Sequence, residues 1–411
     1  MTRLFGTDGV RGVANGDLTP ELALRLGRAA GHILGGPGHS VIIGRDTRRS
    51  GRMLESALAA GLCSVGMDVR LTGHIPTPGL AYLARTEDVV AGAVISASHN
   101  PAPDNGIKFF DHAGLKLPDA TEDRIEAAMA DDTKLPRPTE GGIGLVGDVR
   151  GLVKKYEDFL GALAPKLDGL RVVLDCANGA TYRVAPAALQ KAVVEHKADV
   201  GFAFDGDGDR VMTVDATGTV LDGDFVLALA ARHFAKHGKL DPKLVVGTVM
   251  TNGGLEATLA RDGIGLVRTQ VGDRYVWEEL DKRKAQFGGE PSGHVIFREF
   301  TTTGDGILTG LEVLTLMRFE RRTLTELARE IEHWPQITKN VKAPRRREWK
   351  EVTRFSSAVR DAETELGSAG RLVVRASGTE PVLRITVEAR DDAMAKRIAD
   401  SLAATATEAL A

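Results

Sequence analysis

Cysteine is scarce in this chain, with two residues, Cys63 and Cys176, among 411. Their spacing matches no disulfide framework and no metal-binding pattern, which argues against a small disulfide-stabilised secreted fold. Both lie among apolar or small residues in the sequence. We therefore expect two buried free thiols in a reducing compartment.

Long apolar runs and an excess of charge are also lacking. No stretch approaches the roughly 20 apolar residues that cross a bilayer, and the opening MTRLFG has no signal-peptide core. The net charge of -3 and the pI near 6.4 give no electrostatic attraction to nucleic acid. These absences predict a cytoplasmic protein with neither a membrane nor a nucleic acid as partner.

What the sequence does contain is a repeated alternation of strand and helix patterns. The pattern starts near residue 40 and restarts near 171 and 243, and a Pro- and Gly-rich stretch at 131–147 resembles a linker. The predicted fold class is α/β, with three mixed α/β sheet domains, helices on both sheet faces, and a small C-terminal α+β domain around a central cleft. The predicted domains are 1–147, 148–241, 242–334 and 335–411.

Each predicted domain has one conspicuous polar loop, and in the first it follows an apolar strand. This loop reads Ser-Ala-Ser-His-Asn-Pro over 96–101, and Ser98 is placed for nucleophilic or phosphoryl-carrying work. It lacks the Gly-x-Ser-x-Gly pattern of serine hydrolases. A plain turn with local Ser and Asn hydrogen bonds would use the same residues.

The second loop alternates the carboxylates of Asp205, Asp207 and Asp209 with two glycines. Because glycine lets the backbone curl, the carboxylates can face one hard divalent cation such as Mg²⁺. An EF-hand is excluded, since Arg210 stands where its sharp-turn glycine belongs and Ala216 where its bidentate Glu belongs. The alternative is a solvated acidic turn, in which three crowded like charges would cost stability.

The other two loops contain groups that suit a phosphosugar. Around 375–381, small residues and hydroxyls lie between Arg375 and Arg384, a composition suited to phosphate, although a plain hairpin would also use Ser-Gly-Thr. In the Gly-rich loop 289–294, Glu290 and Ser292 could hold sugar hydroxyls, with Pro291 stiffening their spacing.

Taken together, five segments resemble the alpha-phosphohexomutase superfamily in content and order: 5–12, 96–101, 205–210, 289–294 and 375–381. The resemblance covers nearly the whole chain. Four further segments resemble the branch that acts on glucosamine phosphate: 95–101, 104–110, 271–276 and 301–306.

The resemblance implies an intramolecular phosphotransferase that interconverts glucosamine 6-phosphate and glucosamine 1-phosphate. The reaction would pass through a phosphoserine and a hexosamine 1,6-bisphosphate intermediate, with Mg²⁺ as cofactor and a homodimer as a possible assembly. One alternative is the same chemistry on glucose or mannose phosphates. The others are a metal-dependent phosphatase and a catalytically silent phosphosugar-binding protein.

The resemblance also assigns roles to residues, one set to each domain. In the first domain Ser98 would carry the phosphoryl group, and it would share the metal with the three aspartates of the second. The predicted site residues are, around the reacting oxygen, Arg11, Lys108 and His294; at the sugar, Glu290, Ser292 and Arg274; and at the distant phosphate, Arg375, Ser377, Gly378, Thr379 and Arg384.

One departure from the superfamily lies in the second domain. After the segment 175–182 the family has a helix, another strand and a long loop, whereas here the chain passes from Ala187 and Ala188 directly into Leu189. Relative to the family pattern, a strand and its loop are missing. We expect the second sheet to be narrower, or to have an open edge.

Overall fold

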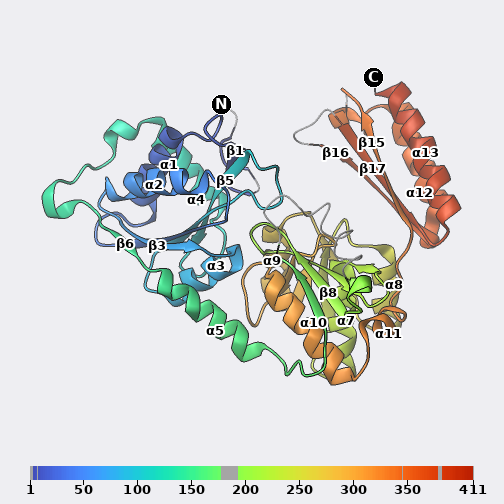
Figure 1. Ribbon diagram of the computed structural model, residues 1–411. Coiled ribbons are helices and arrows are strands. Elements are labelled where there is room, and N and C mark those ends of the chain that lie inside the picture. Colours follow the sequence, from blue (N-terminus) through green and yellow to red (C-terminus); the bar gives the residue numbers. More distant parts are fainter. Residues whose placement is uncertain (1–2, 7, 177–192, 345, 378–381, 411) are drawn as a thin grey trace.

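The computed structural model describes residues 3–6, 8–176, 193–344, 346–377 and 382–410. Four sheets follow one another along the chain, each accompanied by helices (Figure 1). The predicted α/β fold class with a small C-terminal α+β unit is confirmed. Among the described residues, none of the helices has the length and apolar character needed to cross a membrane.

The first sheet has six strands, in the order β1-β5-β4-β2-β3-β6. Its strands are β1 (Val10–Val13), β2 (Ser40–Arg45), β3 (Asp68–His74), β4 (Ala91–Ile95), β5 (Asp104–Asp111) and β6 (Val146–Asp148). Its helices are α1 (Pro20–Leu34), α2 (Gly51–Cys63), α3 (Thr77–Thr86) and α4 (Asp119–Ala130). Strand β2 runs parallel to both β3 and β4, so the chain leaves β2 and β4 at the same edge of the sheet.

Both faces of this sheet are covered because successive side chains of a strand point to opposite faces. Val41 and Ile43 of β2 pack in one apolar cluster with residues of α1, α2 and α4, whereas Ile42 packs in another with residues of α3. The stretch predicted as a linker contributes more structure than expected, since β6 pairs with β3. Its glycines, which suggested a linker, allow close packing: a Cβ on Gly144 would lie 2.0 Å from the Met67 oxygen.

The second sheet has the order β10-β9-β8-β7. Its strands are β7 (Val172–Asp175), β8 (Val200–Phe204), β9 (Val211–Asp215) and β10 (Val220–Leu221). In the described part of the chain β7 pairs with β8 alone, and Leu174 is 59% exposed, as an open edge would have it. The missing segment predicted after Ala187 lies outside the described residues.

The prediction of two buried thiols is half wrong. Cys63 is buried in the core of the first sheet, but Cys176 is exposed. Cys176 directly follows β7, the strand whose Leu174 is also exposed, so its small apolar neighbours in the sequence do not bring it into a core.

The third sheet has the order β12-β11-β13-β14 and shares one apolar cluster with the second. Its strands are β11 (Leu244–Thr248), β12 (Gly265–Thr269), β13 (Phe287–Gly289) and β14 (Val295–Phe297). The helices of this region are α7 (Gly223–Lys236), α8 (Gly253–Arg261), α9 (Asp273–Arg283), α10 (Gly306–Glu320) and α11 (Leu324–Ala328). Because α7 packs against α8 and α10, it lies with the third sheet; the domain boundaries themselves stay predictions.

The last unit has its own apolar cluster and a three-stranded antiparallel sheet, β15-β17-β16. It consists of β15 (Gln336–Lys342), β16 (Gly370–Ala376), β17 (Val382–Ala389), α12 (Thr353–Leu366) and α13 (Asp392–Ala409). Figure 1 shows it beside the third unit, at the opposite end of the molecule from α2. The long helix α5 (Val153–Leu163) leads from the first sheet to the second (Figure 1).

A buried hydrogen bond joins α5 to the start of α10. The Tyr156 hydroxyl donates to Asp305 Oδ2 at 2.9 Å, and the other carboxylate oxygen accepts from the Leu308 N–H, which caps α10. Burial raises the pKa of Asp305 to about 6, although both hydrogen bonds act against this rise. A carboxyl whose folded-state pKa is raised loses stabilising free energy as the pH rises from its unfolded-state pKa to its folded-state pKa.

We expect Tyr156→Phe to lower the unfolding free energy by about 1.5 to 3 kcal/mol at pH 7, the range for a hydrogen bond to a charged group. The loss should shrink towards pH 4.5, where Asp305 is protonated in the folded state. Urea unfolding of the wild type and variant at pH 4.5 and pH 7 measures this difference. An equal loss at both pH values would contradict the assignment.

Candidate active site

Ser98 occupies a backbone conformation that is rare for a residue with a side chain. Its φ is +50°, in the left-handed region. The buried Arg48 guanidinium holds the loop in place by donating to the carbonyls of Ser98 at 2.9 Å, Asn100 at 2.7 Å, Pro101 at 2.7 Å and Asp104 at 3.0 Å. Such strain persists where the surrounding structure fixes the chain, which is common at functional sites.

Ser96, at the start of the loop, and Asp46 fix the Ser98 backbone and Arg48. The Ser98 N–H donates to Ser96 Oγ at 2.9 Å, and this hydroxyl donates to Asp46 Oδ2 at 2.6 Å. Arg48 Nε donates to the same Asp46 oxygen at 3.1 Å. Because Asp46 follows β2 and Ser96 follows β4, the parallel pairing of these strands brings the groups together.

The Ser98 hydroxyl points at the second unit. It donates to Asp205 Oδ2 at 2.6 Å, across a sequence separation of 107 residues. The side chain is nevertheless covered, and Ser98 is only 3% exposed. The structure therefore brings the serine and the aspartate loop together in an arrangement that must open before a sugar can reach the hydroxyl.

The three aspartates form a buried carboxylate cluster. One oxygen each from Asp205, Asp207 and Asp209 lies within 4.8 Å of the others. Gly208, with φ +72°, provides the backbone turn between the last two. Burial and the neighbouring carboxylates raise the pKa of Asp205 and of Asp209.

This cluster has the properties of a cation site. Among the described residues, Asp207 Oδ1 and Asp209 Oδ1 are buried without a hydrogen-bond partner, and Arg210 Nε lies 3.7 Å from Asp209 Oδ1. Buried carboxylate oxygens without hydrogen bonds are costly unless cations neutralise them. Oxygen ligands alone suit a hard divalent cation. Ser98 Oγ, hydrogen-bonded to Asp205, lies beside the same cluster.

A contact with the first unit orients the aspartate loop. Thr77, the first residue of α3, donates through its hydroxyl to Asp207 Oδ2 at 2.7 Å and through its N–H to the Asp207 carbonyl at 2.8 Å. Both groups are buried. The two units are therefore joined at the cation site, where the serine of one faces the carboxylates of the other.

Arg11 and Lys108 meet at one carboxylate. Both pair with Asp8, and Arg11 Nη1 also donates to Asn100 Oδ1 at 3.4 Å. Burial alone would lower the pKa of Lys108, but Asp8, Asp273 and the aspartate cluster together raise it above its usual value. Lys108 is thus a fixed cation beside the site, better suited to stabilise negative charge than to accept a proton.

His294 lies beside Asp209, and His99 lies beside Ser98. His294 Nε2 is 4.0 Å from Asp209 Oδ2 and accepts a hydrogen bond from the Gly304 N–H at 3.1 Å. His99 Nδ1 lies 3.1 Å from Ser98 Oγ. Burial and then the Arg210 guanidinium lower the pKa of His99 to about 4, so its imidazole is neutral at physiological pH.

Four of the predicted sugar and phosphate residues line one cavity of about 390 Å³ between the third and last units. Glu290, Ser292, Arg375 and Arg384 all line it. Glu290 is held in place by the Gly272 N–H, which donates to its Oε1 at 3.0 Å. The two arginines stand opposite each other on β16 and β17, an arrangement of like charges that an anion between them would stabilise.

Three predicted phosphate residues lie elsewhere or outside the described chain. Ser377 is buried at the end of β16, where its N–H donates to the Val382 carbonyl at 2.9 Å. Gly378 and Thr379 lie outside the described residues. Their place in the site stays a prediction.

Arg274 is not among the residues that line the sugar cavity. It pairs with Asp119 of the first unit and, through Nε at 3.1 Å, with Glu278 on its own helix. The ion pair of Arg274 with Asp119 joins the third unit to the first. The predicted contact of Arg274 with the sugar would require these ion pairs to open.

Several residues of the site were missed by the sequence analysis. They are Asp8, Asp46, Arg48, Thr77 and His99. Asp46 and Arg48 had a usable signal, because they follow the strand pattern that starts near residue 40. Asp8 and His99 lie within segments that carry the resemblance, but they were given no role. Thr77 offered no signal, since its partner Asp207 is distant in sequence.

Comparison with known proteins identifies the family of the chain. Family models of phosphoglucomutase/phosphomannomutase match residues 2–136 as domain I, 222–334 as domain III and 339–405 as the C-terminal domain. A phosphoglucosamine mutase of Desulforamulus reducens is 48% identical, over 98% of this chain and 99% of its own length. The chain belongs to the phosphoglucosamine mutase family. This confirms the predicted family and the predicted enzyme class, an isomerase.

Solved structures share the fold of this phosphoglucosamine mutase family member. A phosphoglucomutase/phosphomannomutase family protein of Burkholderia thailandensis has a TM-score of 0.81 at 24% identity, covering 100% of this chain and 98% of its own. The N-acetylphosphoglucosamine mutase of Aspergillus fumigatus, in complex with GlcNAc-6P and magnesium, has a TM-score of 0.65 at 16% identity, covering 99% and 96%.

The family alignment also bears on the missing segment. The match to the Desulforamulus phosphoglucosamine mutase extends over 438 residues, more than the 411 of this chain, so the relative has residues that this chain lacks. The second sheet and the region after Ala187 lie between the first two matched family models, in 137–221.

Proposed function

We propose that this enzyme interconverts glucosamine 6-phosphate and glucosamine 1-phosphate, with Ser98 as the residue that carries the phosphoryl group. The observation that carries the proposal is the 2.6 Å hydrogen bond between the Ser98 hydroxyl and Asp205, at a buried carboxylate cluster. A phosphoserine at this place would present its oxygens to the same cation as the carboxylates. The family to which the chain belongs supports the choice of glucosamine phosphate.

The reaction consists of two matched transfers. In the first, the bond from phosphorus to Ser98 Oγ breaks while a bond to the free sugar hydroxyl forms, which gives a hexosamine 1,6-bisphosphate. In the second, the bond from the other phosphorus to its sugar oxygen breaks while a bond to Ser98 Oγ forms, which regenerates the phosphoserine and frees that sugar hydroxyl. Such transfers need in-line positioning and charge stabilisation more than covalent assistance from the protein.

We assign Mg²⁺ to Asp205, Asp207 and Asp209, with a phosphoserine oxygen as a further ligand. A bound Mg²⁺ would offset negative charge on the transferring group. The A. fumigatus enzyme, which shares the fold, was solved with magnesium. The two buried aspartate oxygens without partners support the assignment in this chain.

The cationic groups suggest how the roles around the reacting oxygen are divided. Lys108, which Asp8 keeps protonated, would stabilise negative charge on the transferring phosphoryl group. Arg11, fixed by Asp8 and Asn100, would act in the same way. The proton of the sugar hydroxyl then needs another acceptor, for which His294 remains the predicted candidate.

The distant end of the substrate would bind in the cavity between the third and last units. Arg375 and Arg384 would hold the phosphate that does not react, and Glu290 and Ser292 would accept and donate hydrogen bonds to sugar hydroxyls. Because the sugar must present each end in turn, this cavity would hold two orientations. Opening of the last unit would admit the substrate and let the intermediate turn.

The substrate choice is tested by comparing kcat/KM for the 6-phosphates of glucosamine, glucose and mannose, with release of inorganic phosphate followed in parallel. We expect glucosamine 6-phosphate to be preferred and phosphate release to be negligible. A preference for glucose or mannose phosphate would contradict the substrate assignment. Phosphate release in place of isomerisation would indicate a phosphatase.

We expect Arg375→Ala to raise KM for the phosphosugar at least tenfold with a smaller change in kcat, since a charged hydrogen bond contributes about 1.5 to 3 kcal/mol. Steady-state kinetics measure the split. Arg371→Ala is the matched control, because Arg371 lies on the same strand but pairs with Glu388 away from the cavity lining. Unchanged KM and kcat in Arg375→Ala would remove Arg375 from the site.

The predicted cytoplasmic location, the possible homodimer and the absence of nucleic-acid partners remain predictions. None of them enters the proposed reaction.

A further inference from the structure

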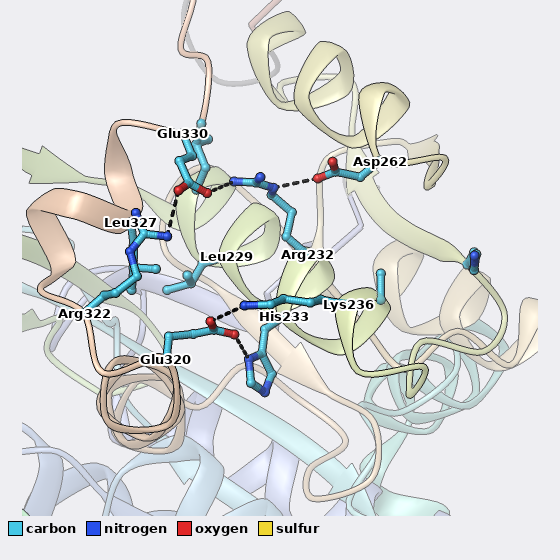
Figure 2. A pocket seen from close by; sticks show the side chains of 12 residues that line it. Leu229, Arg232, His233, Lys236, Asp262, Glu320, Arg322, Leu327 and Glu330 are labelled. Carbon is cyan, nitrogen blue, oxygen red and sulfur yellow. Dashed lines mark hydrogen bonds and ion pairs between the residues drawn. The ribbon is translucent and has the colours of Figure 1, made fainter.

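A second group of metal-ligating side chains lies far from the aspartate cluster, where α7 ends beside the end of α10. His233 and His237 are one helical turn apart, and Glu320 is the last residue of α10. Glu320 Oε1 lies 2.8 Å from His233 Nδ1 and 3.4 Å from His237 Nε2. Figure 2 shows the Glu320 carboxylate between His233 and Lys236.

The surroundings of these three residues resemble a partly closed site. Their side chains are 9%, 31% and 10% exposed, in the order His233, His237 and Glu320. The Phe319 ring packs edge-on against both imidazoles, with centroids 4.8 Å away in each case. His233 and Glu320 also line a cavity of about 350 Å³, which gives solvent a route to the group.

A second charged side chain orients the Glu320 carboxylate. The Lys236 ammonium lies 2.6 Å from Glu320 Oε2. Lys236 thus occupies one carboxylate oxygen and leaves Oε1 facing the two histidines, as a partner of a metal ligand commonly does.

We propose that His233, His237 and Glu320 form a binding site for a transition-metal cation of the Zn²⁺ type, separate from the aspartate cluster. Two imidazole nitrogens and one carboxylate oxygen converge within 4.8 Å of one another, a donor set that suits Zn²⁺ and Cu²⁺ better than Mg²⁺. Water from the cavity would complete the coordination. The bound metal would fasten the end of α7 to the end of α10.

The alternative is an ion-pair network with no metal, in which two histidines and Lys236 neutralise Glu320 at the end of α10. Such a network would form whatever the metal concentration of the buffer. The two interpretations differ in whether a transition metal binds through histidine nitrogen.

The test uses the full-length protein without an affinity tag, with excess Mg²⁺ present to fill the aspartate cluster. Cu²⁺ is added at one equivalent, and electron paramagnetic resonance detects hyperfine coupling from imidazole nitrogen. Zn²⁺ is titrated in parallel while the thermal midpoint is recorded. We expect a nitrogen signature in the wild type and a midpoint that rises with Zn²⁺.

The variant His237→Ala should lose the nitrogen signature and bind Zn²⁺ at least about tenfold more weakly, since loss of even an outer partner of a ligand costs that much. Glu320→Gln should also weaken binding. The matched control is His333→Ala, an exposed histidine of the same unit that pairs with Asp222 instead. The proposal is overturned if the wild type shows no nitrogen coupling, or if His237→Ala and the wild type respond alike to both metals.

Discussion

Ser98→Ala should abolish isomerisation while leaving the fold intact. Loss of an attacking or carrying nucleophile costs roughly 10⁴- to 10⁶-fold in turnover. The lost hydroxyl hydrogen-bonds to Asp205 and to His99, so the unfolding free energy should change by only about 1 to 2 kcal/mol. Coupled assays for glucosamine 1-phosphate and the intact mass of the purified proteins measure both the activity and the bound phosphate.

The matched control for this variant is Ser96→Ala. Ser96 lies in the same loop, is also buried, and supports the Ser98 backbone and Asp46 without facing the carboxylate cluster. We expect reduced activity but continued phosphorylation of the protein. Phosphate on the Ser98→Ala protein, or turnover close to that of the wild type, would contradict the role of Ser98.

Asp209→Asn should reduce activity by roughly 10²- to 10³-fold, the scale on which one group that stabilises the transition state contributes. When chelator is present, the same substitution should leave the unfolding free energy unchanged or raise it. Burial and neighbouring carboxylates raise the pKa of Asp209, which means that the charged form is costly without a cation. Urea unfolding of the wild type and the variant, with chelator and with excess Mg²⁺, measures this difference in unfolding free energy.

We expect the wild type to gain stability on adding Mg²⁺ and the Asp209→Asn variant to gain less. With chelator, the variant should unfold at a urea concentration equal to or above that of the wild type. Asp158→Asn, at an exposed residue on α5, is a control that should behave as the wild type in both media. Activity that survives chelation would count against a metal at the aspartate loop.

Local patterns were sufficient for the fold because each element has its own signal. The strand and helix pattern that restarts near residue 243 corresponds to β11, α8 and β12. The strand at 146–148 was not predicted, because a three-residue strand in a glycine-rich stretch resembles a linker. Its pairing with β3 is visible only in the structure. The exposure of Cys176 was not predicted for a similar reason, because burial depends on what covers a strand and composition does not reveal this.

For the site, the sequence indicated the groups that react but not those that hold them. Ser98 and the three aspartates occur in compact motifs. Arg48 acts through four carbonyls of a loop some fifty residues away, and no local pattern marks a guanidinium for that role. Arg274 shows the opposite case, in which a motif residue is paired with Asp119 of another unit rather than turned towards the sugar.

The paired arginines of β16 and β17 have a thermodynamic consequence. The last unit has an apolar cluster of its own, so it can lose its structure separately from the rest of the chain. Arg375 and Arg384 lie opposite each other on adjacent strands, so their guanidinium groups repel, and a phosphate bound between them would offset that repulsion. Phosphosugar should therefore slow amide hydrogen exchange most in β16 and β17. The exchange rate of these two strands then reports whether the ligand is bound.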